Sequence, residues 1–366
     1  MKNLIKSISI VLCFIMLMLS TSCSLLDMVF PKPPVTEGHT CESVCSICGK
    51  CKDTECVEDV CKDKCQNHVI TTVDPDNLYK TVDLNLMSFN IRTIATETNP
   101  VNNWDSRKNA VVDFIKTCGA DIIGMQEVRQ TQYEYIKSGT SGKYEVIYFP
   151  RETGSNPEGL AFAYDASKFT LVSQEKYWLS DTPDTQSKGW GEEYYRIAAV
   201  IVLEHIESGE QVKAINTHGP LNDTANTKAY ELIMERSVKE GDPFTFLCGD
   251  FNAEPDKIGY VPVAKELQDC RVSAEESSTR YDSTFTGWGN YVPGETPGKQ
   301  IDFCFVSKGA NVTVKTYEVR MDKWGENNEN WISDHFPIQT EVRFSYKTNV
   351  PDSTVDGFDG DVDIFN

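Results

Sequence analysis

The chain has 366 residues, of which 40% are hydrophobic and 25% are charged, so it contains enough apolar material for a globular core. It is strongly acidic, with 35 Lys and Arg against 55 Asp and Glu and a formal net charge of -20. Binding along a nucleic acid backbone requires many phosphates to be neutralised by Lys and Arg, and this balance disfavours a general affinity for long nucleic acids. It excludes neither a small phosphorylated substrate nor a metal ion that supplies positive charge, and a long nucleic acid is not ruled out.

The first residues have the layout of a secretory signal. Lys2 and Lys6 precede an apolar stretch over residues 8–19, and small residues lead from there to Cys23. A membrane-spanning helix needs about 20 apolar residues, so this stretch is short for a transmembrane anchor, and residues 1–22 are predicted to be a signal peptide. The sequence before Cys23 resembles a bacterial lipoprotein processing site. Cys23 would then be the lipidated first residue of an extracytoplasmic, cell-surface lipoprotein held at the membrane, and simple secretion is the alternative.

A cysteine-rich segment follows a proline-containing linker over residues 23–40. Residues 41–68 contain seven of the 13 cysteines, and His68 comes after them. Outside the cytoplasm such a density predicts a small module stapled by disulfides, although three bridges leave one thiol over. Alternatively, the seven thiolates and His68 supply enough ligands for two four-coordinate Zn²⁺ sites. The sequence leaves both interpretations open for Cys41, Cys45, Cys48, Cys51, Cys56, Cys61 and Cys65.

The rest of the chain divides by composition into a linker, a large domain and a tail. Residues 69–82 are interpreted as a second linker, and residues 83–346 have the composition of a mixed α/β domain. The last twenty residues, 347–366, hold five aspartates and few large apolar side chains. Such a segment cannot bury enough apolar surface to fold, so we expect a disordered acidic tail.

Strand-like and helix-like segments alternate within the large domain. One helical pattern places Val111, Val112 and Ile115 on a single face, with Asp105 as its expected N-cap. The expected helices are 104–120 and 229–240, and the expected strands are 83–91, 120–128, 160–165, 196–205, 211–219, 243–252, 300–307 and 333–344.

Polar side chains gather where these strands end. Rigid backbone at a strand end holds side chains that the adjoining loops leave accessible, so this is a usual place for an active site. The residues concerned are Asn90, Glu127, His218, Asp250, Asn252, Asp334 and His335.

Seven short motifs run through the large domain, and five of them contain these residues. They are MSFNIR (87–92), GMQEV (124–128), NTH (216–218), GDFNAEP (249–255), STFTGW (283–288), QIDFCFV (300–306) and SDHFPI (333–338). Together they resemble the endonuclease/exonuclease/phosphatase superfamily, which has the deoxyribonuclease I-like fold. Residues 178–202 look like a branch of prokaryotic members described as metal-dependent hydrolases. The resemblance implies an α/β (α+β) four-layer sandwich, in which two packed mixed β-sheets are flanked by helices.

The resemblance also implies roles in phosphoester hydrolysis. The reaction places negative charge on the phosphoryl and leaving oxygens, and a hard cation such as Mg²⁺ or Mn²⁺ suits it. Glu127 is expected to be the main metal ligand, with Asn90 as a neutral oxygen ligand and Asp334 as a further carboxylate. Asp250 would orient or deprotonate the attacking water, and Asn252 would donate amide hydrogens to the phosphate.

Two histidines lie in matched motifs, and the resemblance gives each a carboxylate partner. His335 would be oriented by Asp302, which favours a charged ring beside the phosphoryl group. His218 would be paired with Glu158, by similarity to the deoxyribonuclease branch. Two imidazole rings, each paired with a carboxylate, would suit general acid and general base roles. They could equally stabilise the negative charge of the phosphate from two sides.

Three further positions bear on the phosphate and on the metal. Arg196 matches a family arginine that contacts phosphate, and Thr284 matches a hydroxyl donor near the same oxygens. The abasic-endonuclease branch has an acidic residue where this chain has Arg92. We therefore expect one dominant cation.

The substrate is less narrowly defined than the reaction. A nuclease, a sphingomyelinase-like phospholipase and a sugar- or inositol-phosphate phosphatase share this set of residues. Residues 83–346 contain 26 Lys and Arg against 40 Asp and Glu, so the negative charge is not confined to the tail. This favours a small phosphorylated molecule or a short nucleotide, handled by a monomer. A non-catalytic surface lipoprotein that retains the fold is the competing interpretation.

Overall fold

The computed structural model describes residues 79–347, except for residues 256, 258, 293–294 and 296–297. The predicted signal peptide, Cys23, the cysteine-rich module and nearly all of the acidic tail lie outside the described residues. Within the described part, no helix is both long enough and apolar enough to cross a membrane. The first strand begins at Tyr79, inside the segment interpreted as a linker.

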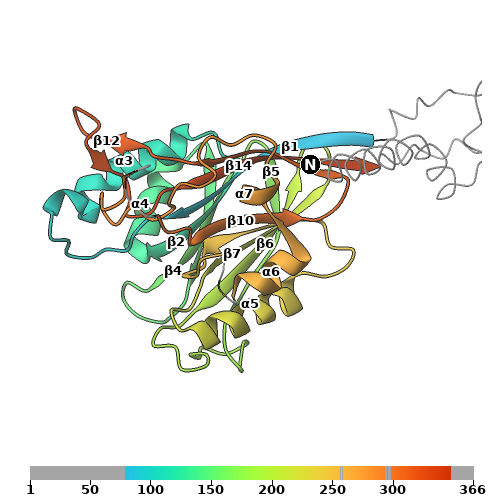
Figure 1. The fold of residues 1–366 in the computed structure, drawn as a ribbon, viewed down its shortest axis with the longest axis horizontal. Coiled ribbons are helices and arrows are strands. Elements are labelled where there is room, and N and C mark those ends of the chain that lie inside the picture. The colour runs from blue at the N-terminus through green and yellow to red at the C-terminus, as the bar shows by residue number, and fades with distance from the viewer. Residues whose placement is uncertain (1–78, 256, 258, 293–294, 296–297, 348–366) are drawn as a thin grey trace, which may run out of the picture. The chain divides into compact units, whose positions relative to one another are not determined.

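The described residues form an alternating series of strands and helices (Figure 1). In chain order the elements are β1 (Tyr79–Asn90), η3 (Pro100–Asn102), α3 (Trp104–Thr117), β2 (Ile122–Arg129), α4 (Gln130–Thr140), β3 (Tyr144–Pro150), β4 (Glu158–Asp165), β5 (Phe169–Trp178), β6 (Ile197–His205), β7 (Gln211–His218), α5 (Asp223–Ser237), β8 (Phe244–Asp250), α6 (Tyr260–Glu266), β9 (Leu267–Asp269), α7 (Cys270–Ser273), β10 (Asp302–Ser307), β11 (Val312–Val319), β12 (Lys323–Trp324), β13 (Asn330–Trp331) and β14 (Ile338–Lys347).

Two six-stranded sheets organise the fold. The first has the order β11-β14-β1-β2-β4-β3, and the second has the order β5-β6-β7-β8-β10-β9. Both are mixed, because β1 pairs with β2 and β7 with β8 in parallel, while their other neighbours are antiparallel. The parallel pairs bring the ends of β1, β2, β7 and β8 to the same edge of the sandwich, and this edge carries the site.

Three apolar clusters show that the molecule has four layers. One fills the space between the sheets and includes Leu86 and Phe246. A second joins the outer face of the first sheet to α3 and α4, and a third joins the outer face of the second sheet to α5 and α6 (Figure 1). Because both faces of the central strands are covered, these strands are almost continuously apolar in sequence. The expected four-layer sandwich is confirmed.

A buried polar contact also joins the two sheets near the site. Gln126 donates from Nε2 to Asn216 Oδ1 over 2.8 Å, and Asn216 Nδ2 donates to the Met125 carbonyl over 2.9 Å. The sheets approach closely here because Gly124 has no side chain, and a Cβ at that position would lie 2.2 Å from Cys248 Sγ. The contact fixes the relative position of β2 and β7, which carry Glu127 and His218.

The expected elements differ from the observed ones mainly at their boundaries. The N-cap of α3 is Asn103, and Asp105 lies in the first turn, where it forms an ion pair with Lys108 at 2.8 Å. Strand β14 begins at Ile338 and not at residue 333, because Pro337 has no backbone N–H to donate to a sheet. The residues before Pro337 are therefore free to face the site.

Candidate active site

A pocket of about 560 Å³ opens at the edge where β1, β2, β7 and β8 end. Both sheets contribute to it, through their strand ends and the loops that follow. Most of the residues predicted for the site line it. These are Glu127, Glu158, Arg196, His218, Asp250, Asn252, Asp334 and His335.

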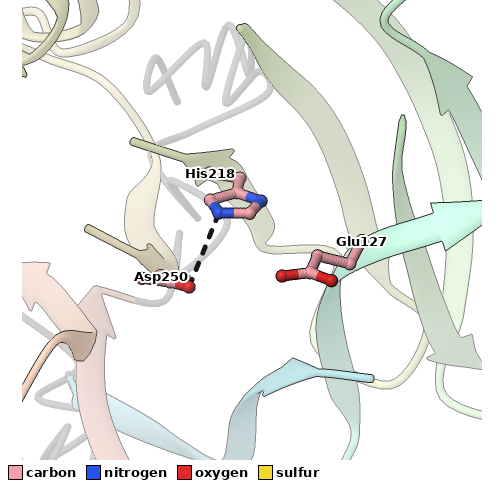
Figure 2. Close-up of side chains that lie close together, drawn as sticks. All are labelled: Glu127, His218 and Asp250. Carbon is pink, nitrogen blue, oxygen red and sulfur yellow. Dashed lines mark ion pairs between the residues drawn. The ribbon is translucent and has the colours of Figure 1, made fainter. Parts of the chain in front are cut away.

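Three of these side chains converge at the centre of the pocket (Figure 2). Glu127 comes from β2, His218 from the end of β7, and Asp250 from the end of β8. One ligand-type atom from each lies within 4.8 Å of the others, and His218 Nε2 is 3.5 Å from Asp250 Oδ2. Residues separated by more than 120 positions in the sequence thus meet at one point, as expected.

Asn90 adopts an orientation that differs from the expected one. Its Nδ2 group donates to Glu127 Oε1 over 3.1 Å and to Asp250 Oδ2 over 3.0 Å. Its Oδ1 accepts from the backbone N–H of Arg92 over 3.0 Å. Asn90 therefore turns its amide nitrogen to the carboxylates in this arrangement, and its role as a neutral oxygen ligand of the metal stays a prediction. The amide nitrogen bridges the two carboxylates, because two anionic oxygens attract the donor end of the side chain.

Glu127, Asn252 and Arg92 have backbone conformations that are unusual for residues other than glycine. Their φ angles are 61°, 51° and 59°, in the left-handed region. The pairing of β2 with β4 also shifts register between Met125 and Val128, so Glu127 lies in an irregularity of the strand. Such local strain and such bulges occur at sites where a side chain must be aimed away from the regular ladder. Here they turn the Glu127 carboxylate into the pocket.

Asp250 is almost fully buried and titrates unusually. Burial and the nearby Asp302 carboxylate raise the pKa of Asp250 to about 7. A carboxylate with this pKa is a stronger base than an exposed aspartate, and it can accept a proton near neutral pH. The expected role of Asp250 in deprotonating water is consistent with this environment.

His335 and Asp302 form the expected pair. His335 Nδ1 and Asp302 Oδ2 are 2.9 Å apart, and His335 Nε2 lies 3.7 Å from Asp250 Oδ2. Although burial opposes a charged ring, the carboxylates of Asp302 and Asp250 raise the pKa of His335 well above its usual value. The ring is therefore an imidazolium at neutral pH.

His218 is not paired with Glu158, which corrects the second predicted pair. Glu158 instead contacts two arginines, at 2.6 Å from Arg151 and 3.6 Å from Arg129. Among the described residues, His218 Nδ1 has no hydrogen-bond partner. Burial and the positive charges of Arg196 and Arg151 lower the pKa of His218 well below its usual value. The ring is therefore neutral at neutral pH, because it is buried and faces positive charges, and Glu158 is held by the two arginines.

Asn252 combines a turn-forming contact with an accessible amide. Its backbone N–H donates to Asp250 Oδ1 over 2.9 Å, and its Nδ2 donates to the Gly219 carbonyl over 2.9 Å. Phe251 between them is fully buried and stacks on Tyr230 with ring centroids 4.2 Å apart. The buried ring anchors the turn, so Asp250 and Asn252 both face the pocket.

Thr284 does not line the pocket, so its predicted contact with substrate is wrong. The side chain is fully buried. Its hydroxyl accepts from the backbone N–H groups of Ile301 and Asp302, each over 3.0 Å. The hydroxyl is thus occupied by the backbone at the start of β10, where it fixes the position of Asp302.

Arg196, in contrast, is placed as a phosphate contact requires. It is 4% exposed and lines the pocket. Its Nε and Nη1 have no hydrogen-bond acceptor, and it forms no ion pair, in the described part of the chain. A buried guanidinium without a carboxylate partner is costly unless a ligand supplies the anion.

A carboxylate-rich group in the pocket fits a divalent cation. Glu127 and Asp250 offer oxygens at its centre, and Asp334 lies at its edge, 3.4 Å from Arg92 Nη1. Burial, together with the neighbouring Glu127 carboxylate, raises the pKa values of Asp250 and Asp334, so a cation in the pocket would favour their ionised forms. Hard oxygen donors in this number are the ligands that Mg²⁺ and Mn²⁺ take, usually together with several waters. The other acid–imidazole group, Asp250 with Asp302 and His335, is already joined by a hydrogen bond.

Several site residues were not identified from sequence. Arg151 and Arg129 carry no periodic or motif signal, and only the structure brings them to Glu158. Arg107 is fully buried in α3 and donates to the carbonyls of Ile91 and Arg92 at 2.6 and 2.7 Å. An arginine within an apolar helical face was the available signal for Arg107.

The chain resembles several known proteins. The sequence profile of the Endonuclease/Exonuclease/phosphatase family matches residues 87–335. A mannosyl-6-phosphatase from Bacteroides thetaiotaomicron has a similar structure, with a TM-score of 0.64, 27% sequence identity, and 71% of this chain and 99% of that chain covered. An uncharacterized protein of Acanthamoeba polyphaga mimivirus is 28% identical over 272 residues, covering 70% of this chain and 97% of that protein. The 3'-5'-exoribonuclease subunit Ccr4 of Mycosarcoma maydis is 24% identical over 310 residues, and the chain spans 46% of its length.

The profile match covers more than half of the chain and includes every residue of the candidate active site named above. Enzymes of this family generally use divalent metal ions, and the carboxylate group around Glu127 and Asp250 is a candidate for holding one. The chain therefore belongs to the endonuclease/exonuclease/phosphatase family and is a hydrolase that acts on phosphoester bonds.

Proposed function

We propose that the protein is a Mg²⁺-dependent hydrolase of small phosphorylated molecules or short nucleotides. The observation that carries this proposal is the charge of the pocket lining. Five arginine and lysine side chains, in addition to the His335 imidazolium, face four carboxylates there, although the whole chain carries a net charge of -20. Positive charge concentrated in one pocket of an acidic protein attracts a small anion and not a long polyanion. The cations are Arg92, Arg129, Arg151, Arg196 and Lys299, and the carboxylates are Glu127, Glu158, Asp250 and Asp334.

The proposed reaction is the attack of water on phosphorus, and each residue of the site has one role in it. Asp250 accepts a proton from the attacking water, since its raised pKa makes it a competent base. The neutral His218 ring and the Asn252 amide donate hydrogen bonds to phosphoryl oxygens, and Arg196 neutralises their charge. The His335 imidazolium, held by Asp302, stabilises the charge that develops as the ester bond breaks. A cation held by Glu127 with Asp250 would supply further neutralisation of this charge.

The size of the pocket supports a small substrate. Its volume of about 560 Å³ lies within the range of sites that enclose small molecules. The similar Bacteroides protein is described as a mannosyl-6-phosphatase, which supports a sugar phosphate. The similarity to the Ccr4 exoribonuclease subunit supports a nuclease as the second candidate. A phospholipase has less support, because the tryptophans of the β12–β13 hairpin pack inward, Trp331 against Phe336.

A substrate panel tests this proposal. The purified protein would be assayed with hexose phosphates, inositol phosphates, nucleotides, sphingomyelin, RNA and DNA, each with Mg²⁺ and with EDTA. We expect Mg²⁺-dependent release from one of the small phosphorylated compounds, with kcat/KM at least tenfold above that for the polymers. A preference for RNA or DNA would establish the nuclease instead.

We also propose that the enzyme is tethered outside the cytoplasm through a lipid on Cys23. The support is the signal-like sequence that precedes this cysteine. In a bacterial host the full chain should partition into the detergent phase of a membrane extract, and the Cys23→Ser variant should not. Equal partitioning of the two proteins would rule out the lipid anchor.

A further inference from the structure

The end of the pocket away from His335 is formed by Arg129, Arg151 and Glu158, and we call it the arginine end. All three line the same pocket as the catalytic residues. The proposed reaction assigns no step to Arg129 or Arg151. These two guanidinium groups share a single carboxylate, Glu158, and a second positive charge in a partly buried pocket is costly without a further anion.

The strand order places the arginine end at a distance from the attacked phosphorus. In the first sheet, the strand of Asn90 is followed by β2, β4 and β3, and Arg151 comes directly after β3. Neighbouring strands are about 4.8 Å apart, so Arg151 starts roughly 14 Å from the strand of Asn90. In the second sheet Arg196 precedes β6, two strands from Asp250, and it lines a small cavity together with Arg151, Glu158 and His218. Arg196 therefore lies between the two ends.

The fold occupies the guanidinium groups at this end only in part. Arg129 donates from Nε to Thr93 Oγ1 over 3.0 Å and from Nη1 to the Asn156 carbonyl over 3.1 Å, and neither acceptor neutralises its charge. Arg129, Arg151 and Arg196 have one acidic hydrogen-bonding or ion-pair partner between them in the described residues, Glu158. Arg151 Nε has no hydrogen-bond acceptor within that same part of the chain, although Arg151 is buried. Arg196 is assigned to the attacked phosphoryl group, so Arg129 and Arg151 face one carboxylate, Glu158, and one positive charge at this end is left in excess.

Tyr194 gives this end a defined shape. The guanidinium carbons of Arg151 and Arg196 each lie 5.5 Å from the centroid of its ring. The ring lines the pocket and is 45% exposed. Contacts of this kind hold guanidinium groups in place and leave their N–H groups available. The arrangement is therefore a prepared site for an anion and not a pair of mobile surface side chains.

We propose that the arginine end binds a second anionic group of the substrate, on the order of 10 Å from the phosphorus that is attacked. This proposal rests on the proposed function and specifies its substrate class: a small phosphoester that carries another phosphate or a carboxylate. Guanidinium groups bind either anion through paired N–H groups, and the bond is charge-assisted. Arg151 and Arg129 are then the residues that determine specificity.

Three compounds on one hexose scaffold test the proposal. They are glucose 6-phosphate, glucose 1,6-bisphosphate and 6-phosphogluconate, which share the phosphate at carbon 6 and carry a hydroxyl, a phosphate or a carboxylate at carbon 1, the last in an open chain. We expect kcat/KM for at least one of the two compounds with a second anion to exceed that for glucose 6-phosphate by tenfold or more, mainly through KM. Preference for the bisphosphate or for the phosphogluconate then identifies the second group as phosphate or carboxylate. Equal values for all three would overturn the proposal.

Variants assign the preference to the arginine end. In Arg151→Met and in Arg129→Met the advantage of the doubly anionic substrate should fall at least tenfold relative to glucose 6-phosphate, and Arg151→Lys should retain part of it. Arg343→Met is the matched control, because Arg343 pairs with Asp83 on the first sheet and lies outside the pocket. An advantage that persists in both methionine variants would contradict the assignment. Arg129 is less buried than Arg151, so Arg129→Met covers the case in which Arg151→Met does not fold.

A binding measurement separates this proposal from the proposed function. If none of the three compounds is hydrolysed, the proposal that the enzyme hydrolyses phosphoesters of this class is refuted. Calorimetric binding of glucose 1,6-bisphosphate and glucose 6-phosphate to Asp250→Asn then decides about the arginine end. Binding of the bisphosphate at least tenfold tighter, lost on adding Arg151→Met, supports the anion site, and equal binding of the two compounds refutes it.

Discussion

Asp302 acts through another residue, because it does not line the pocket. Its carboxylate holds His335 Nδ1 at 2.9 Å, and its own backbone is fixed by the Thr284 hydroxyl at 3.0 Å. The carboxylate raises the pKa values of both His335 and Asp250. Asp302 therefore sets the protonation of the charged ring and of the base at the same time.

The Asp302→Asn variant should lower the rate and move the pH profile. We expect kcat to fall by about 100-fold or more, since positioned acid–base groups contribute on this scale. Removing the Asp302 charge lowers the pKa of Asp250, so the ionised base persists to lower pH and the acid limb of the profile shifts down. The pKa of His335 falls too, so the basic limb shifts in the same direction.

The measurement is kcat/KM against pH at a fixed, saturating Mg²⁺ concentration. Asp165→Asn is a suitable control, because Asp165 lies at the last position of β4 and does not line the pocket. The pocket is at the opposite end of this strand, where Glu158 is the first residue. That variant should keep the wild-type profile. A profile of Asp302→Asn with unmoved limbs would show that the charge of Asp302 does not control the site.

A site residue could be predicted from the sequence where the family motifs imply both the residue and the side chain that it contacts. His335 is in this class, and its predicted partner Asp302 was correct. Glu158 and Thr284 were assigned wrongly, because the partner of a side chain depends on neighbours from other segments. Arg151 competes with His218 for Glu158, and no feature of the local sequence around Glu158 indicates it.

At the scale of elements, α3 joins two of the loops that form the site. Arg107 on this helix donates to the carbonyls of Ile91 and Arg92, which follow Asn90, and to that of Ile332 over 3.1 Å. Its guanidinium also lies 5.3 and 5.5 Å from the ring centroids of Trp104 and Trp288. Burial lowers the pKa of Arg107 to about 10, so it remains charged at neutral pH. One side chain thus fixes the positions of the Asn90 and Asp334 loops.

Replacing Arg107 with lysine should test this connection. Lysine keeps the charge but cannot reach several carbonyls with a planar group. We expect a loss of about 2–4 kcal/mol in the free energy of unfolding, and at least a tenfold fall in kcat that added Mg²⁺ does not restore. The measurements are thermal unfolding and steady-state kinetics of the folded variant.

Lys116→Met serves as the comparison, because Lys116 is an exposed residue of the same helix. It should change neither stability nor kcat. Wild-type kcat in folded Arg107→Lys would mean that the loops hold their positions without the guanidinium contacts.

Helices and strands were predicted well where burial imposes a strong pattern of apolar residues on the sequence. The apolar runs of β1, β2 and β8 were found because both faces of those strands are covered. Strand β5 was missed, since most of its residues are exposed at the edge of the second sheet and show no alternation. Helix α4 was missed as well, because only three of its residues are buried.

At the scale of the whole molecule, the fold reconciles an acidic chain with an anionic substrate. The sandwich brings arginines from several segments to one edge, so the pocket lining is net positive while the chain is at -20. Composition alone could not indicate this, because it averages over surfaces that the fold separates. The four layers were predictable from the family motifs, whereas the charge distribution required the strand order.

The central claim is that side chains from distant parts of the chain form one metal-dependent hydrolytic site. The most direct measurement is phosphate release from the best substrate of the panel, as a function of Mg²⁺, by the wild-type enzyme and by Glu127→Gln. We predict that EDTA abolishes the wild-type rate, that Mg²⁺ restores it, and that Glu127→Gln reduces kcat/KM at least 100-fold with an unchanged unfolding temperature. Undiminished release in chelator, or wild-type kinetics in Glu127→Gln, would contradict the account.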